Sequence, residues 1–453
     1  MKTFLDWSAY KDAGMGDAYA DIPKHGGDYA KAIAVCINSK QCETLNKQVM
    51  CPSYKVTEDP GLSTGGRVRA LKAALSEDPE TLFQPEIMKA MELCVSCKGC
   101  KRECENNVDM ALIKAEYLAQ YNEKYGRNLR SLLFAHTPRW LYHGLWLRHL
   151  ITLFNASRWF SLFAGKLFGL NTNIPLPAPA REPFQKTSQP QNSGSASEEA
   201  ETKTLPKVAL FVDTFSRYYD PAIAQSAIRV LQSGNYDVEI AEADTGERPY
   251  CCGRTYLAQG MIKEAREEAS RLVHCLKQQI DQGRVVVGLE ASCVLGLRDD
   301  ALALGLGDEA VDVSKKVFLL EEFLSKEIQA KRLNLKFKAD LKKQILIHGH
   351  CHQKAVGAMK AMRRVLKNTP LETYSVIDTA SCCGMAGTFG LEREHEQTSA
   401  KMAEIGLLPA ISENPDALLL ANGFSCRHQI KARSQAAPIH LAQLLDSMIE
   451  LND

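Results

Sequence analysis

Fifteen cysteines divide this chain of 453 residues into two cysteine-bearing regions, and no other feature limits its possible folds as strongly. Seven cysteines lie from Cys36 to Cys104 and eight lie from Cys251 to Cys426, with none between the two groups. The first residues lack the basic and apolar segments of a secretory signal, so we expect no export. In a chain that is not exported, clustered cysteines indicate metal ligands or redox groups rather than disulfide bridges.

Length and composition are typical of a soluble protein with about two to four domains. Hydrophobic residues make up 45% and charged residues 24%, which are ordinary values for globular proteins. The net charge of +1 favours no acidic partner, and we expect no nucleic acid. Since no run of about 18 apolar residues is present, we also expect no transmembrane helix.

The strongest motif has the spacing C-x2-C-x2-C-x3-C and consists of Cys94, Cys97, Cys100 and Cys104. This spacing is typical of bacterial ferredoxins, in which three cysteines in a tight turn surround one 4Fe-4S cluster and the fourth binds a second cluster. The alternative is a set of buried free thiols, which this spacing does not favour. We therefore predict an iron–sulfur cluster in a ferredoxin-like domain. The cations Lys98, Lys101 and Arg102 either offset the cluster charge and raise its potential or form a solvated loop.

A second, incomplete cysteine set lies upstream of this motif. Cys36, Cys42 and Cys51-Pro52 match the first, third and fourth positions of the same run, and Ser39 stands at the second. In a two-cluster arrangement Cys51 completes the set of Cys94, Cys97 and Cys100, and Cys104 joins Cys36 and Cys42. The second set then has three thiols, which leaves open a three-iron cluster, a four-iron cluster with Ser39 or another ligand, or no stable cluster.

A basic, aromatic segment follows the cysteine motif. From Lys124 to Arg181 the chain contains eight Lys or Arg and no Asp or Glu, and three of the four tryptophans lie here. One interpretation is a pair of helices lying on an anionic membrane surface, and the other is a helical hairpin packed on the ferredoxin-like region. Nucleic-acid binding has no supporting motif.

Strand-like runs alternate with helical patterns in the last part of the chain, and this pattern occurs twice. The first copy has strands at 208–213 and 285–293 around Cys251-Cys252-Gly253, and the second has strands at 345–351 and 417–426 around Cys382-Cys383-Gly384. The pattern predicts two α/β units with mainly parallel sheets, whose cysteines lie at the carboxyl edges of the strands.

The second copy is the better candidate for a metal site. Cys351, Cys382, Cys383 and Cys426 are expected to converge there, with His348, His350 and His352 nearby. The first copy offers Cys251, Cys252 and Cys293, and Asp213 follows its opening strand in place of a cysteine. In either copy the alternative is a degenerate repeat with reduced thiols.

These patterns divide the chain into five parts. Residues 174–206 are rich in Pro, Ser, Gln and Glu, which predicts a flexible linker. The predicted parts are an iron–sulfur ferredoxin-like α-helical domain at 1–125, a basic aromatic helical segment at 126–173, the linker at 174–206, and two α/β repeats at 207–335 and 336–453.

Several long motifs occur in order, at residues 49–71, 91–118, 285–293, 348–356, 382–390 and 422–430. Together they resemble the C-terminal half of bacterial FAD and iron–sulfur 2-hydroxyacid dehydrogenases, such as fused D-2-hydroxyglutarate and D-lactate dehydrogenases. The repeats resemble the CCG domain of heterodisulfide reductase. The small iron–sulfur subunits of glycerol-3-phosphate and glycolate dehydrogenases are also similar.

Three departures from these families qualify the resemblance. The fused enzymes carry an FAD-binding region before the cysteine motif, where this chain has 35 residues, so the flavin is expected on a partner subunit. Glu105 follows Cys104 where ferredoxin-type runs usually have proline. Cys426 is followed by Arg427, His428 and Gln429, so the final C-x-x-C pair of heterodisulfide reductase is missing.

The resemblance implies an iron–sulfur electron-transfer subunit of a flavin-dependent 2-hydroxyacid dehydrogenase. A flavin takes two electrons as hydride, an iron–sulfur centre takes one at a time, and the acceptor is expected to be a quinone. The expected location is the cytoplasm, with possible contact with the inner face of the membrane through the basic aromatic segment. The alternatives are a disulfide or heterodisulfide reductase with a catalytic CCG site and a non-redox iron–sulfur scaffold.

Overall fold

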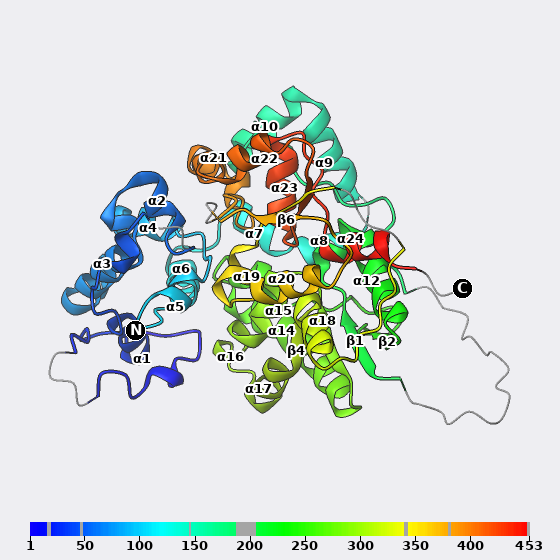
Figure 1. Cartoon of the computed structure of the whole chain (residues 1–453). Coiled ribbons are helices and arrows are strands. Elements are labelled where there is room, and N and C mark those ends of the chain that lie inside the picture. The colour runs from blue at the N-terminus through cyan, green and yellow to red at the C-terminus, as the bar shows by residue number, and fades with distance from the viewer. Residues whose placement is uncertain are drawn as a thin grey trace.

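A computed structural model describes residues 1–15, 20–45, 49–144, 146–186, 205–338, 343–378 and 382–450. An N-terminal helical region lies beside a larger α/β body, and a group of helices extends from that body (Figure 1). The N-terminal region contains η1 (Ser8–Tyr10), α1 (Gly27–Ala34), η2 (Gln41–Glu43), α2 (Pro52–Thr57), η3 (Pro60–Leu62), α3 (Thr64–Glu77), η4 (Pro79–Phe83), α4 (Pro85–Glu92), α5 (Gly99–Glu103) and α6 (Met110–Tyr125).

The N-terminal residues are fastened to helix α6 through one buried carboxylate. Glu116 accepts hydrogen bonds from the backbone N–H groups of Phe4 and Leu5 and from the indole Nε1–H of Trp7. The Trp7 and Leu5 side chains are buried in the same core. Because a buried carboxylate is costly unless it is hydrogen-bonded, this arrangement fixes the start of the chain on α6.

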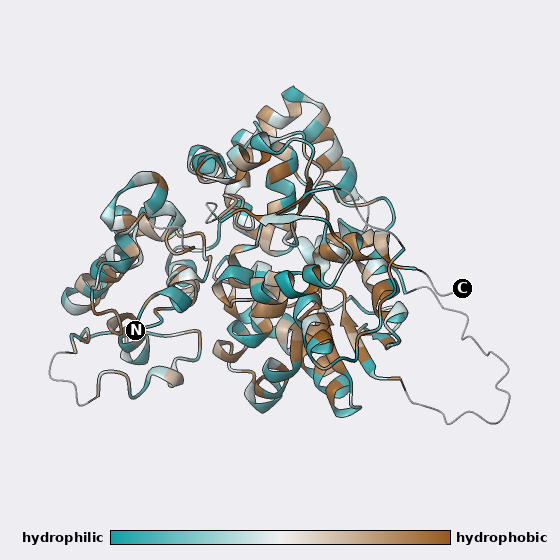
Figure 2. Cartoon of the chain, in the orientation of Figure 1, coloured by the Kyte–Doolittle hydropathy of each residue, from teal (hydrophilic) through white to brown (hydrophobic). Residues whose placement is uncertain are grey.

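The basic aromatic segment forms four helices, which are α7 (Leu129–Ala135), α8 (Thr137–Tyr142), α9 (Trp146–Ala156) and α10 (Arg158–Phe168). After α10 the chain joins the second repeat, where Leu170 bridges to Glu392 and Asn171 N–H donates to the Leu391 carbonyl at 2.8 Å. Helices α7 and α8 contact the first repeat, where the Thr255 hydroxyl donates to the Ala135 carbonyl at 2.9 Å. The segment expected as a hairpin on the ferredoxin-like region therefore lies against both repeats instead. Hydrophobic and hydrophilic residues are interspersed on α9 and α10 (Figure 2).

The predicted linker begins too early at residue 174. Ile174 and Phe184 are buried, and the N–H of Phe184 donates to the Arg217 carbonyl at 2.8 Å. These apolar anchors hold residues 174–186 against the α/β body, and the polar composition around them obscured their role. Residues 187–204 of the predicted linker lie outside the described residues.

The first repeat contains a four-stranded parallel sheet in the order β2-β1-β3-β4. Its strands are β1 (Lys207–Phe211), β2 (Asp237–Ile240), β3 (Val285–Gly288) and β4 (Val317–Leu319). Its helices are α11 (Thr214–Tyr218), α12 (Pro221–Ser233), α13 (Arg254–Leu257), α14 (Ile262–Asp281), α15 (Ala291–Arg298), α16 (Asp300–Ala303), α17 (Gly307–Lys316) and α18 (Leu320–Gln329).

The second repeat contains a three-stranded parallel sheet in the order β6-β5-β7. A single parallel bridge between Leu420 and Ile439 stands where the first repeat has β4. The strands are β5 (Ile345–Ile347), β6 (Tyr374–Val376) and β7 (Leu418–Leu420). The helices are α19 (Cys351–Ala355), α20 (Met359–Lys367), η5 (Phe389–Leu391), η6 (Arg393–His395), α21 (Glu396–Glu404), α22 (Leu407–Glu413), α23 (Phe424–Arg433) and α24 (Leu441–Met448).

The two repeats pack face to face with approximate two-fold symmetry. Helix α12 packs on α24, and its counterpart α20 packs on α18. One hydrophobic core contains residues from both sheets, including Leu210 and Val287 from the first and Ile347 and Leu420 from the second. Parallel strands covered by helices in this way are buried on both faces, which explains their continuous apolar sequences.

The ferredoxin-like region packs on both repeats, because α5 contacts α19 and α2 contacts α21 of the second repeat, while α6 shares a core cluster with the first. Ile113 and Tyr117 of α6 lie in one core cluster with Met261 and Ile262 of the first repeat. This docking face holds the cysteine motif close to the carboxyl edges of the sheets.

Candidate metal centre

Four thiols of the second repeat converge at the carboxyl edge of its sheet. Cys351 begins α19 directly after β5, and Cys426 lies in the first turn of α23 after β7. Side-chain hydrogen bonds link Cys351 to Cys382, Cys382 to Cys383, and Cys383 to Cys426. The structure therefore brings together the four cysteines that strand ends predicted.

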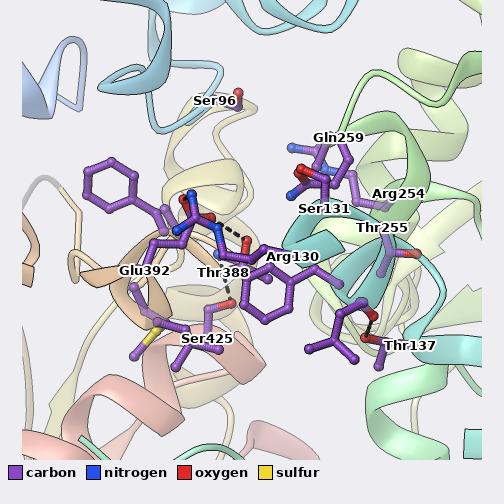
Figure 3. A pocket seen from close by; sticks show the side chains of 18 of the residues that line it. Ser96, Arg130, Ser131, Thr137, Arg254, Thr255, Gln259, Thr388, Glu392 and Ser425 are labelled. Carbon is purple, nitrogen blue, oxygen red and sulfur yellow. Dashed lines mark hydrogen bonds and ion pairs between the residues drawn. The ribbon is translucent and has the colours of Figure 1, made fainter. Parts of the chain in front are cut away.

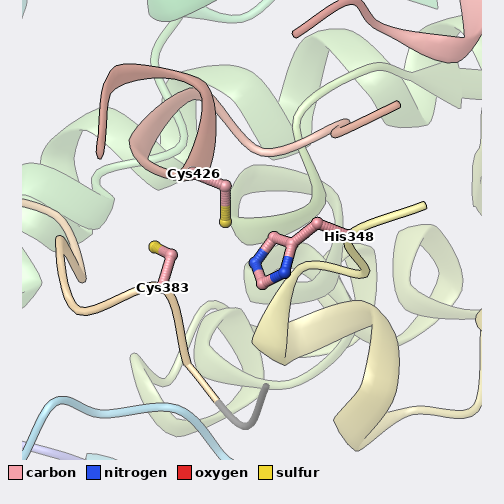
Figure 4. Close-up of side chains that lie close together, drawn as sticks. All are labelled: His348, Cys383 and Cys426. Atoms are coloured by element: carbon pink, nitrogen blue, oxygen red, sulfur yellow. The ribbon is translucent and has the colours of Figure 1, made fainter. Parts of the chain in front are cut away.

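His348 completes this cluster of side chains. The His348 ring is buried, and neither of its nitrogens has a hydrogen-bond partner of good geometry among the described residues. One ring nitrogen and the Sγ atoms of Cys383 and Cys426 lie within 4.8 Å of one another (Figure 4). Buried polar atoms without partners are uncommon, so this ring and these thiols fit a metal ion or an iron–sulfur cluster.

The acidity of the thiols also favours metal binding. A hydrogen bond from Cys382 lowers the pKa of Cys351 to about 6, and hydrogen bonds from Cys382 and Cys426 lower the pKa of Cys383 well below its usual value. The pKa values of Cys382 and Cys426 are correspondingly raised. Because cysteine ligates metals as thiolate, the fold favours the ligating form at two of the four positions.

The first repeat has the same layout with fewer ligands. Hydrogen bonds link the thiol of Cys252 to those of Cys251 and Cys293. Thr214 begins α11 as Cys351 begins α19, and Asp213 caps α11 as His350 caps α19. The residue in place of the fourth cysteine is therefore Thr214, rather than the Asp213 that the sequence indicated.

The ferredoxin-type motif forms a tight turn. Ser96 and Lys98 have left-handed backbones with φ of 48° and 60°, so the chain reverses between the cysteines. Burial raises the pKa of Cys100 to about 12, and the charge of Cys94 adds to this effect. Burial also raises the pKa of Cys97, and the next largest cause is the nearby Cys351 of the second repeat. The motif and the second-repeat thiols are thus electrostatic neighbours.

Cys51 lies between the two N-terminal cysteine sets. Its Sγ atom accepts the Thr64 N–H at 3.0 Å and is hydrogen-bonded to the thiol of Cys42. It also interacts electrostatically with Cys100. The structure therefore places Cys51 within reach of both sets, and its assignment to the set of Cys94, Cys97 and Cys100 stays a prediction.

The incomplete set comes together as the spacing suggested. Cys36, Cys42 and Cys104 line one small cavity, which Ser39 also lines. The hydrogen bond from Cys51 lowers the pKa of Cys42 to about 6. These four residues fit the second ligand set, and their ligand roles stay a prediction.

His352, which the sequence analysis placed near the thiols of the second repeat, also joins the cysteine motif to both repeats. The His352 Nε2 atom lies 3.1 Å from the Ser96 carbonyl oxygen and 3.3 Å from Nη2 of Arg254. Ser96 lies between Cys94 and Cys97, and His352 directly follows Cys351. Helix α5 packs on α19 at this point. A short covalent and hydrogen-bonded path therefore connects the two cysteine sites.

Two of the three basic residues of the motif, Lys98 and Lys101, form ion pairs, whereas Arg102 is exposed as in a solvated loop. Lys98 is buried, and its Nζ atom lies 3.0 Å from Asp109, 2.7 Å from Asp299 and 2.6 Å from Asp300. Lys101 also pairs with Asp299. Burial would lower the pKa of Lys98, but the three carboxylates outweigh it and raise the pKa well above its usual value. The acidic partners balance the charge that was expected to raise the cluster potential.

Two protein families match parts of the chain. The family described as "4Fe-4S dicluster domain" matches residues 34–109, and the family described as "Cysteine-rich domain" matches residues 345–431. The first match covers both N-terminal cysteine sets, and the second covers the four thiols of the second repeat. The chain therefore contains an iron–sulfur domain followed by a CCG domain.

Curated relatives are similar to this chain at low identity. Some of the matches cover most of the chain, and others cover about half of it. D-2-hydroxyglutarate dehydrogenase of Pantoea ananatis is 24% identical over 81% of this chain and 35% of its own length. One subunit of the anaerobic glycerol-3-phosphate dehydrogenase of Escherichia coli K12 is 26% identical over 53% of this chain and 58% of its own length. Lactate utilization protein A of Oceanobacillus iheyensis is 22% identical over 53% of this chain and 97% of its own length.

The chain spans about a third of the length of the D-2-hydroxyglutarate dehydrogenases of Pantoea ananatis and Pseudomonas putida. Two of these relatives are named as a dehydrogenase or a dehydrogenase subunit. Together with the two domain matches, they identify an iron–sulfur, metal-binding protein of the oxidoreductase type.

Proposed function

We propose that this chain is the iron–sulfur electron-transfer component of a flavin-dependent 2-hydroxyacid dehydrogenase. In this proposal a partner protein holds FAD and removes hydride from the substrate. The chain accepts the electrons one at a time and passes them toward a quinone. The relatives named as D-2-hydroxyglutarate dehydrogenase and as a subunit of anaerobic glycerol-3-phosphate dehydrogenase support a dehydrogenase partner.

The observation that carries the proposal is the contact between the two cysteine sites. Cys97 lies near Cys351, and the Ser96 carbonyl contacts the His352 ring at 3.1 Å. A structural cluster needs no such neighbour, whereas an electron relay needs two redox sites at short range. The close approach of the N-terminal motif to the second repeat therefore favours a relay over a non-redox scaffold.

The same geometry supports a set of ligand roles. Cys94, Cys97, Cys100 and Cys51 would hold one 4Fe-4S cluster, and Cys36, Cys42 and Cys104 would contribute to a second. Cys351, Cys382, Cys383 and Cys426 would hold a metal or cluster in the second repeat, with His348 as a further ligand. When bound, these centres supply one-electron redox chemistry. The chain itself shields them, since most of these sulfur atoms are buried.

Helices α9 and α10 support contact with a membrane surface. Large apolar side chains are exposed there, including Trp159 at 87% and Phe163 at 67% of their accessible areas. Arg158 and Lys166 lie on the same helix. None of the helices within the described residues has the length and apolar character to cross a bilayer. We propose that this surface rests on anionic lipid at the inner face of the cytoplasmic membrane.

The proposal is tested by anaerobic reconstitution followed by iron and sulfide analysis, electron paramagnetic resonance and redox titration. We expect about four or more irons per chain and a signal that appears on reduction. Protein without iron and without visible absorption would contradict the proposal. A pull-down with flavin analysis then tests the partner, and a co-purifying flavoprotein is the expected result.

One observation favours a second candidate, a disulfide reductase. The hydrogen-bonded thiols of Cys351 and Cys382 resemble a redox-active pair, because one pKa is lowered to about 6. Turnover of a disulfide by the isolated chain with a chemical reductant, and no electron transfer from a flavoprotein, would favour this candidate.

A further inference from the structure

A cavity of about 550 Å³ lies between the ferredoxin-like region, helices α7 to α9 and both repeats. Thr388 and Ser425 of the second repeat lie on one side of it, and Thr255 and Gln259 of the first repeat lie on the other (Figure 3). The volume is typical of sites that enclose a small organic molecule. The domains predicted from the sequence gave no indication of this cavity, because no single part forms it.

The cavity is in contact with both proposed redox sites. Cys94 of the ferredoxin-type motif and Cys351 of the second repeat both line it. Cys94 is half-buried, although two other cysteines of its motif are fully buried. A molecule in the cavity would therefore lie beside either centre and could exchange electrons with it directly.

Aromatic side chains form one wall of the cavity across the junction of the repeats. Phe215 of the first repeat stacks on Phe424 of the second with ring centroids 4.8 Å apart and an interplanar angle of 20°. Tyr219 lies 4.9 Å from the same Phe424 ring. All three residues line the cavity. Such a wall favours a flat, conjugated ring, since aromatic groups prefer stacked or edge-on neighbours.

Another part of the cavity wall is apolar and comes from α9, which also faces the molecular surface. Leu147 and Ile151 of α9 line it. On the same helix Trp146, Leu150 and Leu153 are exposed by 44 to 46% of their accessible areas. Helix α9 thus presents apolar side chains both to the cavity and to solvent. A ligand with an apolar tail could keep its ring inside and its tail along this helix.

We propose that this cavity binds and reduces a membrane quinone. The inference rests on the proposed electron-transfer function and names the acceptor site. The quinone ring takes two electrons, one at a time, from the iron–sulfur centres, and its two oxygens take two protons from solvent. The product is the hydroquinone, and the iron–sulfur centres are left oxidised.

Cavity-filling variants test the proposal in the full-length, anaerobically reconstituted protein. Ile151→Trp adds bulk from α9, and Ser131→Trp adds bulk from α7 on another wall. Leu150→Trp is the matched control, because Leu150 is the neighbouring residue of α9 and faces solvent. The probe is menadione, a quinone without a long tail, and its affinity is measured by calorimetry together with the iron content of each protein.

We expect both cavity-filling variants to weaken menadione binding by about tenfold or more, while the control stays within about twofold of the wild type. The iron content should be equal in all proteins. Equal affinities in filled and wild-type cavities would overturn the inference while leaving the electron-transfer function intact. A wild-type protein that binds a small disulfide but no menadione would also overturn it. Protein that binds menadione in the cavity but contains no iron would contradict the proposed function instead.

Discussion

The two repeats share one fold and differ in the side chains at the carboxyl edges of their sheets. Both place a Cys-Cys-Gly triplet and a later cysteine at the carboxyl edge of a parallel sheet. In both triplets the glycine has a positive φ, and a Cβ atom would lie within 2.5 Å of a backbone oxygen, at Gly253 and at Gly384. The glycine of each triplet is therefore required for the fold itself, so the shared layout does not by itself indicate a metal site.

Two positions separate the chemistry of the repeats. The repeats align when positions are counted from the helix caps Asp213 and His350. In this alignment Phe211 of the first repeat corresponds to His348 of the second, and Thr214 corresponds to Cys351. The first repeat is left with three thiols at this site, and its outer surface packs on the ferredoxin-like region. Both repeats contact the ferredoxin-like region, but the second repeat alone combines four converging thiols with a buried histidine among the described residues.

The largest expected effect comes from the second repeat. Cys383→Ser should abolish metal binding at this site, because Cys383 is the thiol hydrogen-bonded to two others and close to His348. The matching change Cys252→Ser in the first repeat should leave the metal content unchanged. Iron and zinc analysis of both purified variants tests this expectation. Equal losses of metal in the two variants would contradict the proposed difference between the repeats.

Docking on the first repeat depends on the buried charge of Lys98. Lys98→Met should lower the free energy of unfolding by about 3 kcal/mol, because it leaves Asp109 and Asp300 buried with fewer partners. Urea denaturation monitored by circular dichroism measures the change. Lys101→Met is the control, since Lys101 is more exposed and should cost less. If Lys101→Met lowered the free energy of unfolding as much as Lys98→Met does, the docking role given to Lys98 would be contradicted.

Stability should also depend on pH through a carboxyl group that only the first repeat carries. Glu321 of α18 accepts hydrogen bonds from Gln353 and Asn422 of the second repeat, and Ala442 takes its place in α24. Burial raises the pKa of Glu321 to about 7. The folded state then binds a proton that the unfolded state has released, so stability should fall as pH rises from about 4.5 to about 7.

The variant Glu321→Gln cannot lose this proton, and the fall in stability should be reduced by up to about 3 kcal/mol over that range. Thermal unfolding at a series of pH values measures the difference. An unchanged pH profile in the variant would show that other buried acids, such as Asp213, dominate instead. The pKa of Asp213 is also raised, to about 6, by burial.

The smallest effect tests whether the first repeat can regain a ligand. Thr214→Cys restores the fourth thiol beside Cys251, with which Thr214 is already hydrogen-bonded. We expect cobalt or zinc to bind about tenfold more tightly than in the wild type, a change of about 1.4 kcal/mol. The thiolate-to-cobalt absorption band provides the measurement, and Thr255→Cys, on another helix of the same repeat, provides the control. No change in affinity would show that geometry, rather than ligand count, separates the repeats.

Local patterns were sufficient to predict much of the fold and of the site. The ferredoxin-type spacing and the strand-end cysteines identified residues that converge, because the carboxyl ends of parallel strands meet at one edge. By contrast, the partners Asp299 and Asp300 of Lys98 lie some 200 positions along the chain, and the contact of His352 with Ser96 spans 256 positions. Such pairs depend on domain docking, which composition and periodicity do not encode.

Boundaries were predicted less well than elements. The linker was placed too early, since single anchors such as Phe184 leave no periodic signal. Thr214 was overlooked because the helix cap, and not the end of the strand, aligns the two repeats. The cavity was missed for the same reason as the docking contacts, because its walls come from the ferredoxin-like region, the basic aromatic segment and both repeats.

The core that both sheets share has a consequence for how the protein unfolds. Leu210 and Ile347 belong to one packed cluster, so neither repeat can lose its structure without exposing the other's apolar strands. The two repeats should therefore melt in a single cooperative transition, with equal calorimetric and van't Hoff enthalpies for this part of the molecule. Excising either repeat would leave half a hydrophobic core, so they form one thermodynamic unit despite their repeated sequence.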